Sequence, residues 1–269
     1  MTRQLGILLA ALYFVSAPTF AQTPVPLVVD VGWLEQHLND RRVVIFHLGR
    51  EYETRHIPGA RLLPQGDATV ARLAALGVSD DRHLVLYSVG DEIPVFQMFA
   101  LDTLGFGDRT SVLNGGLRAW VNAGKPVTTE EPRITPGTLA APTPKNLIVD
   151  AEFVKTLAGR PDHKLVDARA PVYYQGIEGL AGKSGHIPGA VNIPFTDVGD
   201  NRTGIDRERL ARLFREAGIN PGDTVVAYCH VGQQARFVVF AARVLGHPVR
   251  LYQGSFADWA GNNRGPVVK

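Results

Sequence analysis

The chain contains a single cysteine, Cys229, at the end of an apolar run within the segment V-V-A-Y-C-H-V-G-Q-Q-A of residues 225–235. A lone thiol cannot close an internal disulfide, so Cys229 is either a small buried apolar residue or a reacting group. Backbone N–H groups and a helix N-terminus after the cysteine would favour an anionic, nucleophilic sulfur. Gly232 would let the intervening loop curl tightly. We therefore take Cys229 as the candidate nucleophile and the next five residues as its loop: His230, Val231, Gly232, Gln233 and Gln234.

The first 21 residues have the features of an export signal. Arg3 supplies a positive charge, residues 5–15 are apolar, and the Thr19-Phe20-Ala21 segment ends in a small residue. A buried N-terminal helix is the alternative reading. The apolar stretch is too short to span a bilayer comfortably. We expect cleavage after Ala21, a periplasmic or secreted mature protein, and no membrane span after cleavage.

Composition excludes some classes of function. The 269 residues are 45% hydrophobic and 20% charged with a formal net charge of +2, which is an ordinary globular balance. Lysines and arginines form no basic run with interleaved aromatic residues, so no nucleic-acid partner is expected. The eight histidines include no pair at metal-ligand spacing with a carboxylate or thiol. We therefore expect no metal site.

Three sequence blocks recur in the same order, which indicates a duplicated domain. The paired blocks are residues 27–30 and 147–150, 55–60 and 185–190, and 115–120 and 254–259. We expect His56 and His186 to hold the same turn in each copy, and Trp120 and Trp259 to be core residues.

The boundaries of the two copies follow from a segment rich in proline and threonine. We predict a first domain over residues 22–125, a linker over 126–146 and a second, catalytic domain over 147–269.

Strands and helices alternate in the second copy. Apolar patterning and capping residues predict helices over residues 151–157, 207–217 and 237–245, and strands over 164–167, 224–228 and 249–252. This order predicts a three-layer α/β/α domain with a mostly parallel central sheet. Cys229 then lies at the carboxyl end of a central strand, where open α/β sheets place their ligands.

The repeated His-Ile-Pro-Gly-Ala block, the Gly-x-x-x-x-Trp block and the cysteine that opens a loop after a strand resemble the rhodanese sulfurtransferases. The arrangement is similar to the tandem-domain enzymes that use thiosulfate or 3-mercaptopyruvate. The resemblance implies that Cys229 takes sulfane sulfur from a small sulfur-containing anion, becomes a persulfide, and passes the sulfur to cyanide or a thiol. It also implies that the reaction needs no metal or organic cofactor.

The same resemblance implies roles for residues outside the loop. Asp167 would brace the loop with Arg169 beside it, and Tyr173 stands where the family carries an arginine. Lys183 or Arg169 would then supply positive charge to the donor. The loop matches neither the basic loop of thiosulfate enzymes nor the small neutral loop of mercaptopyruvate enzymes. We favour thiosulfate because Gln233, Gln234 and His230 can donate hydrogen bonds to a small oxyanion; 3-mercaptopyruvate is the alternative.

The first copy lacks the reacting group. Ser88 aligns with Cys229, the following residues 89–92 include two carboxylates, and His47 replaces the aspartate that Asp167 provides. A hydroxyl does not carry sulfane sulfur, so we expect the first domain to be inactive and structural.

Two other functions compete with sulfur transfer. A cysteine phosphatase would need an arginine six residues after Cys229, where Ala235 stands. Arg236 is one position late, and we expect its side chain to leave the loop. A non-catalytic redox or sulfur-binding module, in which Cys229 is oxidised reversibly, is the remaining alternative.

Overall fold

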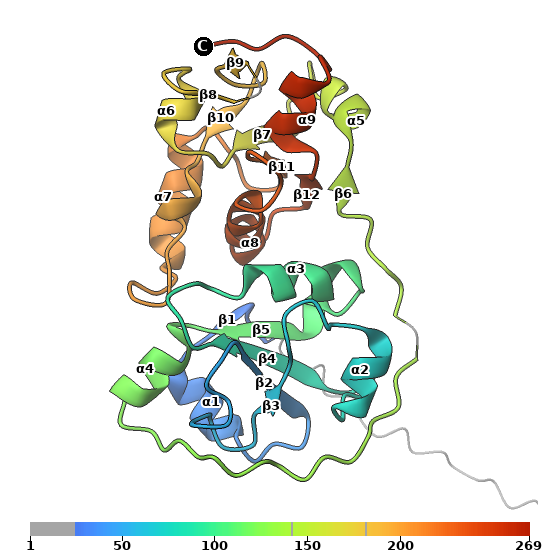
Figure 1. Cartoon of the computed structure of the whole chain (residues 1–269), viewed down its shortest axis with the longest axis vertical. Coiled ribbons are helices and arrows are strands. Elements are labelled where there is room, and N and C mark those ends of the chain that lie inside the picture. The colour runs from blue at the N-terminus through green and yellow to red at the C-terminus, as the bar shows by residue number, and fades with distance from the viewer. Residues whose placement is uncertain (1–24, 141, 181) are drawn as a thin grey trace, which may run out of the picture.

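The computed structural model describes residues 25–140, 142–180 and 182–269, which form two α/β domains stacked end to end (Figure 1). The expected signal peptide of residues 1–21 lies outside the described residues.

Each domain is built on a five-stranded parallel sheet, as the sequence predicts. The first sheet has the order β1-β5-β4-β2-β3, with strands β1 (Val28–Val29), β2 (Val43–Leu48), β3 (Arg61–Leu62), β4 (His83–Ser88) and β5 (Thr110–Leu113). The second has the order β10-β7-β11-β12-β6, with strands β6 (Ile148–Val149), β7 (His163–Asp167), β10 (Val191–Asn192), β11 (Thr224–Tyr228) and β12 (Val249–Tyr252). When the second order is read from β6 to β10, it matches the first strand by strand. The duplication seen in the sequence is therefore a duplication of the fold.

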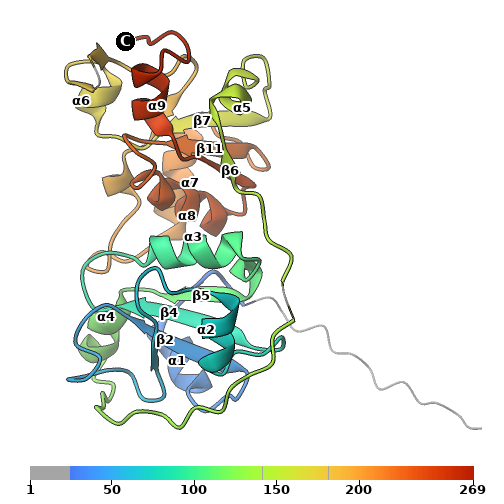
Figure 2. The same ribbon diagram turned by 45° about the vertical axis from the view of Figure 1, so that its right-hand side comes forward.

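Helices cover both faces of each sheet (Figures 1 and 2). Those of the first domain are α1 (Val31–His37), α2 (Val70–Ala75), α3 (Val95–Thr103) and α4 (Gly116–Asn122). Those of the second are α5 (Ala151–Lys155), α6 (Pro171–Tyr174), α7 (Arg207–Glu216), α8 (Ala235–Leu245) and α9 (Ser255–Gly261). A two-stranded antiparallel hairpin, β8 (Gly179–Leu180) and β9 (Lys183–Ser184), extends the second domain.

The central strands carry the least polar sequences. Residues 84–87 of β4 and 225–228 of β11 are fully buried, since helices cover both faces of each sheet. α8 is buried along most of its length and begins at Ala235, two residues earlier than predicted, because Gln234 already has helical backbone angles. α5 ends at Lys155, two residues earlier than predicted.

The two domains pack through α3 and α8 (Figure 2). Their apolar contact is accompanied by a buried ion pair in which Arg243 Nη1 of α8 lies 3.0 Å from Asp102 Oδ2 of α3. The predicted linker follows the surface of the first domain, with Gly137 N–H donating to Ala74 O and Lys145 N–H to Thr103 O. The position of the second domain is therefore fixed by its own helix as well as by the chain that leads to it.

Within the described residues, no helix is both long and apolar enough to cross a membrane.

Candidate active site

Cys229 follows the central strand of the second sheet directly. β11 pairs with β7 on one side and β12 on the other, so the cysteine leaves the sheet at its middle. Cys229 is 1% exposed, whereas Val231 in the same loop is 57% exposed. A molecule that reacts with the sulfur must therefore be small, or the loop must move to admit it.

Gly232 provides the loop's direct contact with the sulfur. Its N–H donates to Cys229 Sγ at 3.2 Å. Gly232 has φ +79°, and a Cβ there would lie 2.5 Å from Gln253 O, so both the backbone angle and the space require glycine. The sequence predicted several converging N–H groups; among the described residues, only that of Gly232 meets hydrogen-bond geometry at the sulfur.

The start of the loop is held by α9. Cys229 N–H donates to Ser255 Oγ at 3.2 Å, and Cys229 O accepts from Phe256 N–H at 3.0 Å. Ser255 is fully buried with φ +56°, a left-handed angle that its repeat partner Gly116 shares at +55°. Ser255 was not among the residues predicted for the site, although its alignment with Gly116 in the other copy was a usable signal.

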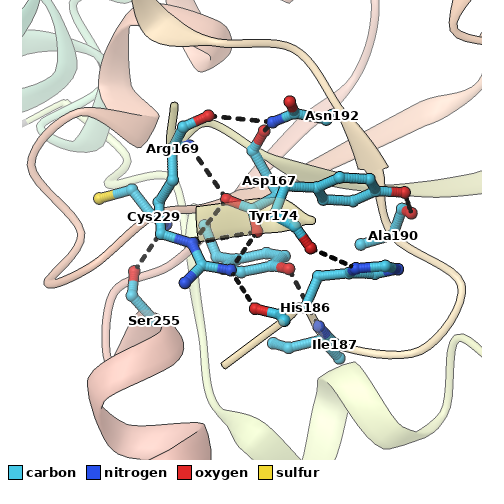
Figure 3. A network of polar contacts seen from close by, with 11 residues as sticks. Asp167, Arg169, Tyr174, His186, Ile187, Ala190, Asn192, Cys229 and Ser255 are labelled. Carbon is cyan, nitrogen blue, oxygen red and sulfur yellow. Dashed lines mark hydrogen bonds and ion pairs between the residues drawn. The ribbon is translucent and has the colours of Figure 1, made fainter. Parts of the chain in front are cut away.

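Asp167 and Arg169 form an ion pair beneath the cysteine (Figure 3). Arg169 Nη2 lies 2.6 Å from Asp167 Oδ2, and the two side chains are 1% and 0% exposed. Arg169 also donates to Gly185 O at 2.7 Å and lies over the ring of Phe256 at 4.0 Å. Cys229 Sγ points away from the pair in Figure 3. The Nε and Nη2 groups of Arg169 are thus engaged, and the side chain lies at the base of the loop without facing the sulfur.

Tyr173, His230 and Lys183 were also predicted at the site, and they differ in what their side chains contact. The ring of Tyr173 meets His230 edge-on, with centroids 4.5 Å apart. Burial, followed by the charge of Arg169, lowers the pKa of His230, so its imidazole is neutral at neutral pH. Lys183 Nζ donates to Asn263 Oδ1 at 2.8 Å. The rings of Tyr173 and His230 therefore pack together at the start of the loop. The ammonium of Lys183 instead contacts Asn263, just after the C-terminus of α9.

Arg236 does not leave the loop, and that expectation is wrong. Its Nη1 donates back to Gly232 O, so the guanidinium closes over the loop. The side chain returns because Ala235 has already started α8, which places Arg236 on the first turn of the helix above Gly232. A phosphatase-type arginine inside the loop is still absent, since the residue six after Cys229 is Ala235.

A comparison with protein families matches the rhodanese-like domain twice, over residues 30–123 and 150–262. The chain belongs to the rhodanese family. It is 33% identical to a thiosulfate sulfurtransferase of Gallus gallus, covering 86% of this chain and 85% of the relative. It is 32% identical to a probable 3-mercaptopyruvate sulfurtransferase of Pseudomonas aeruginosa, covering 81% and 86%.

Solved structures show the same fold. The crystal structure of SseA from Escherichia coli, described as a 3-mercaptopyruvate sulfotransferase, superposes with a TM-score of 0.68. The sequences are 24% identical, and the match covers 86% of this chain and 99% of SseA. The two rhodanese domains predicted from the repeats are therefore confirmed.

Both rhodanese domains hold their histidine turns with the same contacts. His186 Nδ1 is 2.8 Å from Tyr174 O and stacks on the Tyr174 ring, and Tyr174 OH donates to Ala190 O (Figure 3). His56 and Tyr52 repeat this arrangement in the first domain. The predicted structural role of the two histidines is confirmed. Trp120 and Trp259 are buried, as predicted.

A side chain of the second rhodanese domain contacts the corresponding loop of the first. Ser88 Oγ donates to Glu92 O at 2.6 Å and accepts from Asn201 Nδ2 at 2.7 Å. The same amide donates to Gly90 O and Glu92 O, and Asn201 is 4% exposed. Asn201 belongs to the second domain, so a side chain of the thiol-bearing domain contacts the loop that lacks a thiol.

His47 takes the place of Asp167 in this domain. It is fully buried and contacts Tyr87 OH at 3.0 Å and Arg50 O at 3.0 Å. Burial lowers the pKa of His47, so it is neutral where the second domain has an ion pair. The described residues contain no cluster of three or more histidine, cysteine, aspartate or glutamate side chains suited to a metal.

Proposed function

We propose that the protein transfers sulfane sulfur through a persulfide on Cys229. The observation that carries this proposal is the position of Cys229 Sγ at the end of the central strand, where it accepts the N–H of Gly232. The same N–H group can donate a hydrogen bond to the outer sulfur of a persulfide anion, if that sulfur comes to lie within about one bond length of the thiolate position. The relatives named as sulfurtransferases support the same activity.

The proposed reaction has two steps. The thiolate of Cys229 attacks the sulfane sulfur of thiosulfate, an S–S bond forms on the enzyme as the donor's S–S bond breaks, and sulfite leaves with the electron pair. Cyanide then attacks the outer sulfur of the persulfide, thiocyanate leaves, and the thiolate is restored. A thiol acceptor would take the same sulfur as a persulfide of its own.

Thiosulfate is the donor we propose, with 3-mercaptopyruvate as the alternative. A keto acid needs a bidentate partner for its carboxylate, and Arg169 is already committed to Asp167 and Gly185 O. Lys183 is committed to Asn263, and Arg236 donates to Gly232 O and lies over Phe96 and Phe99. The exposed amide of Gln233 and the neutral His230 remain as hydrogen-bond donors for a small oxyanion. The named relatives include enzymes for both donors, so a direct measurement decides.

The test compares steady-state rates with each donor and cyanide as acceptor, using protein that begins at Gln22. We expect a higher kcat/KM for thiosulfate. Cys229→Ser should abolish turnover with both donors while the protein stays folded, because serine cannot form the persulfide. Substantial turnover by a purified Cys229→Ser protein would refute the mechanism. Higher kcat/KM for 3-mercaptopyruvate would reverse the donor assignment.

We also propose export and cleavage after Ala21. The support is the charge of Arg3, the apolar segment 5–15 and the small residue at the junction. Expression of the full chain in a bacterium, followed by fractionation and intact mass, tests this. A periplasmic protein beginning at Gln22 supports it, and an uncleaved cytoplasmic protein refutes it.

A further inference from the structure

Arg236 contacts the sulfur loop on one side and the other domain on its opposite side. From the first turn of α8 its Nη1 donates to Gly232 O, and the N–H of Gly232 in turn donates to Cys229 Sγ. The arginine therefore holds the residue whose peptide group contacts the sulfur. Glycine adopts the left-handed φ of +79° readily and without strain, so a side-chain contact such as that of Arg236 restricts an otherwise freely mobile peptide.

The opposite face of the guanidinium rests on the first domain. Arg236 Cζ lies 5.3 Å from the ring centroid of Phe96 and 5.2 Å from that of Phe99, both on α3. These distances are within the range of a cation–π contact. α3 follows the thiol-free loop of the first domain. The aromatic rings that contact Arg236 therefore belong to the domain that has no reacting group.

The charge of Arg236 is also the one left available near the loop. Arg169 is paired with Asp167, Lys183 donates to Asn263, and His230 is neutral. Within the described part of the chain, no salt bridge to a carboxylate engages Arg236. Burial lowers the pKa of Arg236, and the neighbouring sulfur of Cys229 opposes that effect. Guanidinium groups keep their proton under such conditions, so the side chain stays positive.

We propose that Arg236 is a positioning residue for sulfur transfer: seated on Phe96 and Phe99, it fixes Gly232 N–H toward Cys229 Sγ and brings positive charge to the sulfur anion. The first domain then takes part in the reaction of the second through its aromatic side chains. This inference rests on the proposed function for its catalytic meaning, whereas its effect on the thiol can be measured without any donor.

A purely structural role would be domain docking, and the helix supplies a matched control for it. Arg243 lies two turns further along α8 and also reaches the first domain, through its ion pair with Asp102 at 3.0 Å. It makes no contact with the loop in the described structure. If Arg236 acted by docking alone, replacing either arginine would change the reactivity of Cys229 to the same extent.

The experiment measures alkylation of Cys229 by iodoacetamide as a function of pH, which is unambiguous because the chain has a single cysteine. The proteins are the unchanged enzyme, Arg236→Gln, Arg236→Lys, Phe96→Leu and Arg243→Gln, each checked for folding by urea denaturation. Persulfide formation is followed in parallel by intact mass after addition of thiosulfate or 3-mercaptopyruvate.

We expect Arg236→Gln to slow alkylation at pH 7 about tenfold, because a charge-assisted hydrogen bond is lost, and to move the alkylation profile to higher pH. Arg236→Lys should restore part of the rate, and Phe96→Leu should slow it about threefold. Arg243→Gln should leave rate and profile unchanged.

An unaltered rate and pH profile in Arg236→Gln, or an equal loss in Arg243→Gln, would overturn the proposal. So would an Arg236→Lys protein as slow as Arg236→Gln, since the charge would then be irrelevant. Failure of the unchanged enzyme to gain sulfur mass from either donor would count against the proposed function instead, and the alkylation series would still decide the role of Arg236.

Discussion

Asn201 and Ser88 are 113 residues apart in sequence and are joined by a hydrogen bond of 2.7 Å across the domain interface. Ser88 is the position that corresponds to Cys229, so the second domain places a side-chain amide where the first domain would otherwise hold a sulfur anion. The converse contact also exists: Asn114 of the first domain accepts from Ile205 N–H and donates to Ile205 O. These reciprocal asparagines connect the domains independently of the α3–α8 contact.

Removal of the Asn201 amide should weaken the interface. Asn201→Ala deletes the part-buried contacts of one amide with Ser88 Oγ, Gly90 O and Glu92 O, so we expect the free energy of unfolding to fall by about 1–3 kcal/mol. Urea denaturation measures this. The control is Arg202→Ala, which removes a solvent-exposed ion pair with Asp91 and should change the unfolding free energy much less. Equal losses of unfolding free energy in the two variants would show that the Asn201 amide stabilises the interface no more than an exposed ion pair does.

Gly232 gives a prediction about activity. Gly232→Ala places a Cβ 2.5 Å from Gln253 O at a left-handed φ, so the loop must shift and its N–H must move from Cys229 Sγ. We expect kcat/KM for sulfur transfer to fall at least about 100-fold, as when a preorganised donor is lost from an oxyanion hole. Gly222→Ala is the matched control, since Gly222 also has a positive φ (+89°) but open space around it. That variant should lose about 1 kcal/mol of stability and keep its activity. Normal kcat/KM in Gly232→Ala would remove the N–H contact from the mechanism.

Buried His83 should make stability depend on pH. Burial, and secondarily the charge of His37, lowers the pKa of His83 to about 4, and its Nε2 is 2.8 Å from Ser111 Oγ. The unfolded chain takes up this proton near pH 6.5, whereas the folded chain does so only near pH 4. The folded state binds fewer protons in that interval, so the contribution of His83 to stability is present above pH 6.5 and is lost as the pH falls toward 4.

Urea denaturation at several values between about pH 7 and about pH 4 tests this for the unchanged protein and for His83→Gln. The difference in unfolding free energy between the two proteins should shrink steadily as the pH falls. A difference that stays constant across the interval would mean that His83 titrates normally in the folded state.

Local signals explain which features the sequence could predict. The repeated blocks and the apolar run of β11 are patterns of neighbouring residues, so they identified the duplicated α/β domain and placed Cys229 at a strand end. The glycine requirement at position 232 was likewise visible, because only glycine suits a tight loop there. The Asn201 contact was invisible, since it joins two loops that no periodicity links. The side-chain directions of Arg236 and Arg169 depend on the helix start and on a buried partner, which composition does not report.

The thiol-free loop offers a test of how far the serine alone explains the inactivity of the first domain. Ser88→Ala should leave sulfur transfer unchanged, because within the described residues the hydroxyl hydrogen-bonds to Glu92 O and Asn201. Introducing a thiol with Ser88→Cys in a Cys229→Ser background should also fail to restore turnover. The Asn201 amide contacts position 88, Asp91 is held by Arg118 and Arg202, and neutral His47 stands where the second domain has its ion pair.

Intact mass after incubation with thiosulfate or 3-mercaptopyruvate measures the outcome directly. We expect no gain of sulfur on the introduced thiol of the double variant, whereas the enzyme with Cys229 gains one sulfur atom. Adding Asn201→Gly to the double variant would remove the amide that contacts position 88. If the Ser88→Cys protein formed a persulfide with Asn201 in place, the serine substitution alone would account for the inactive domain, and the Asn201 contact would have no part in it.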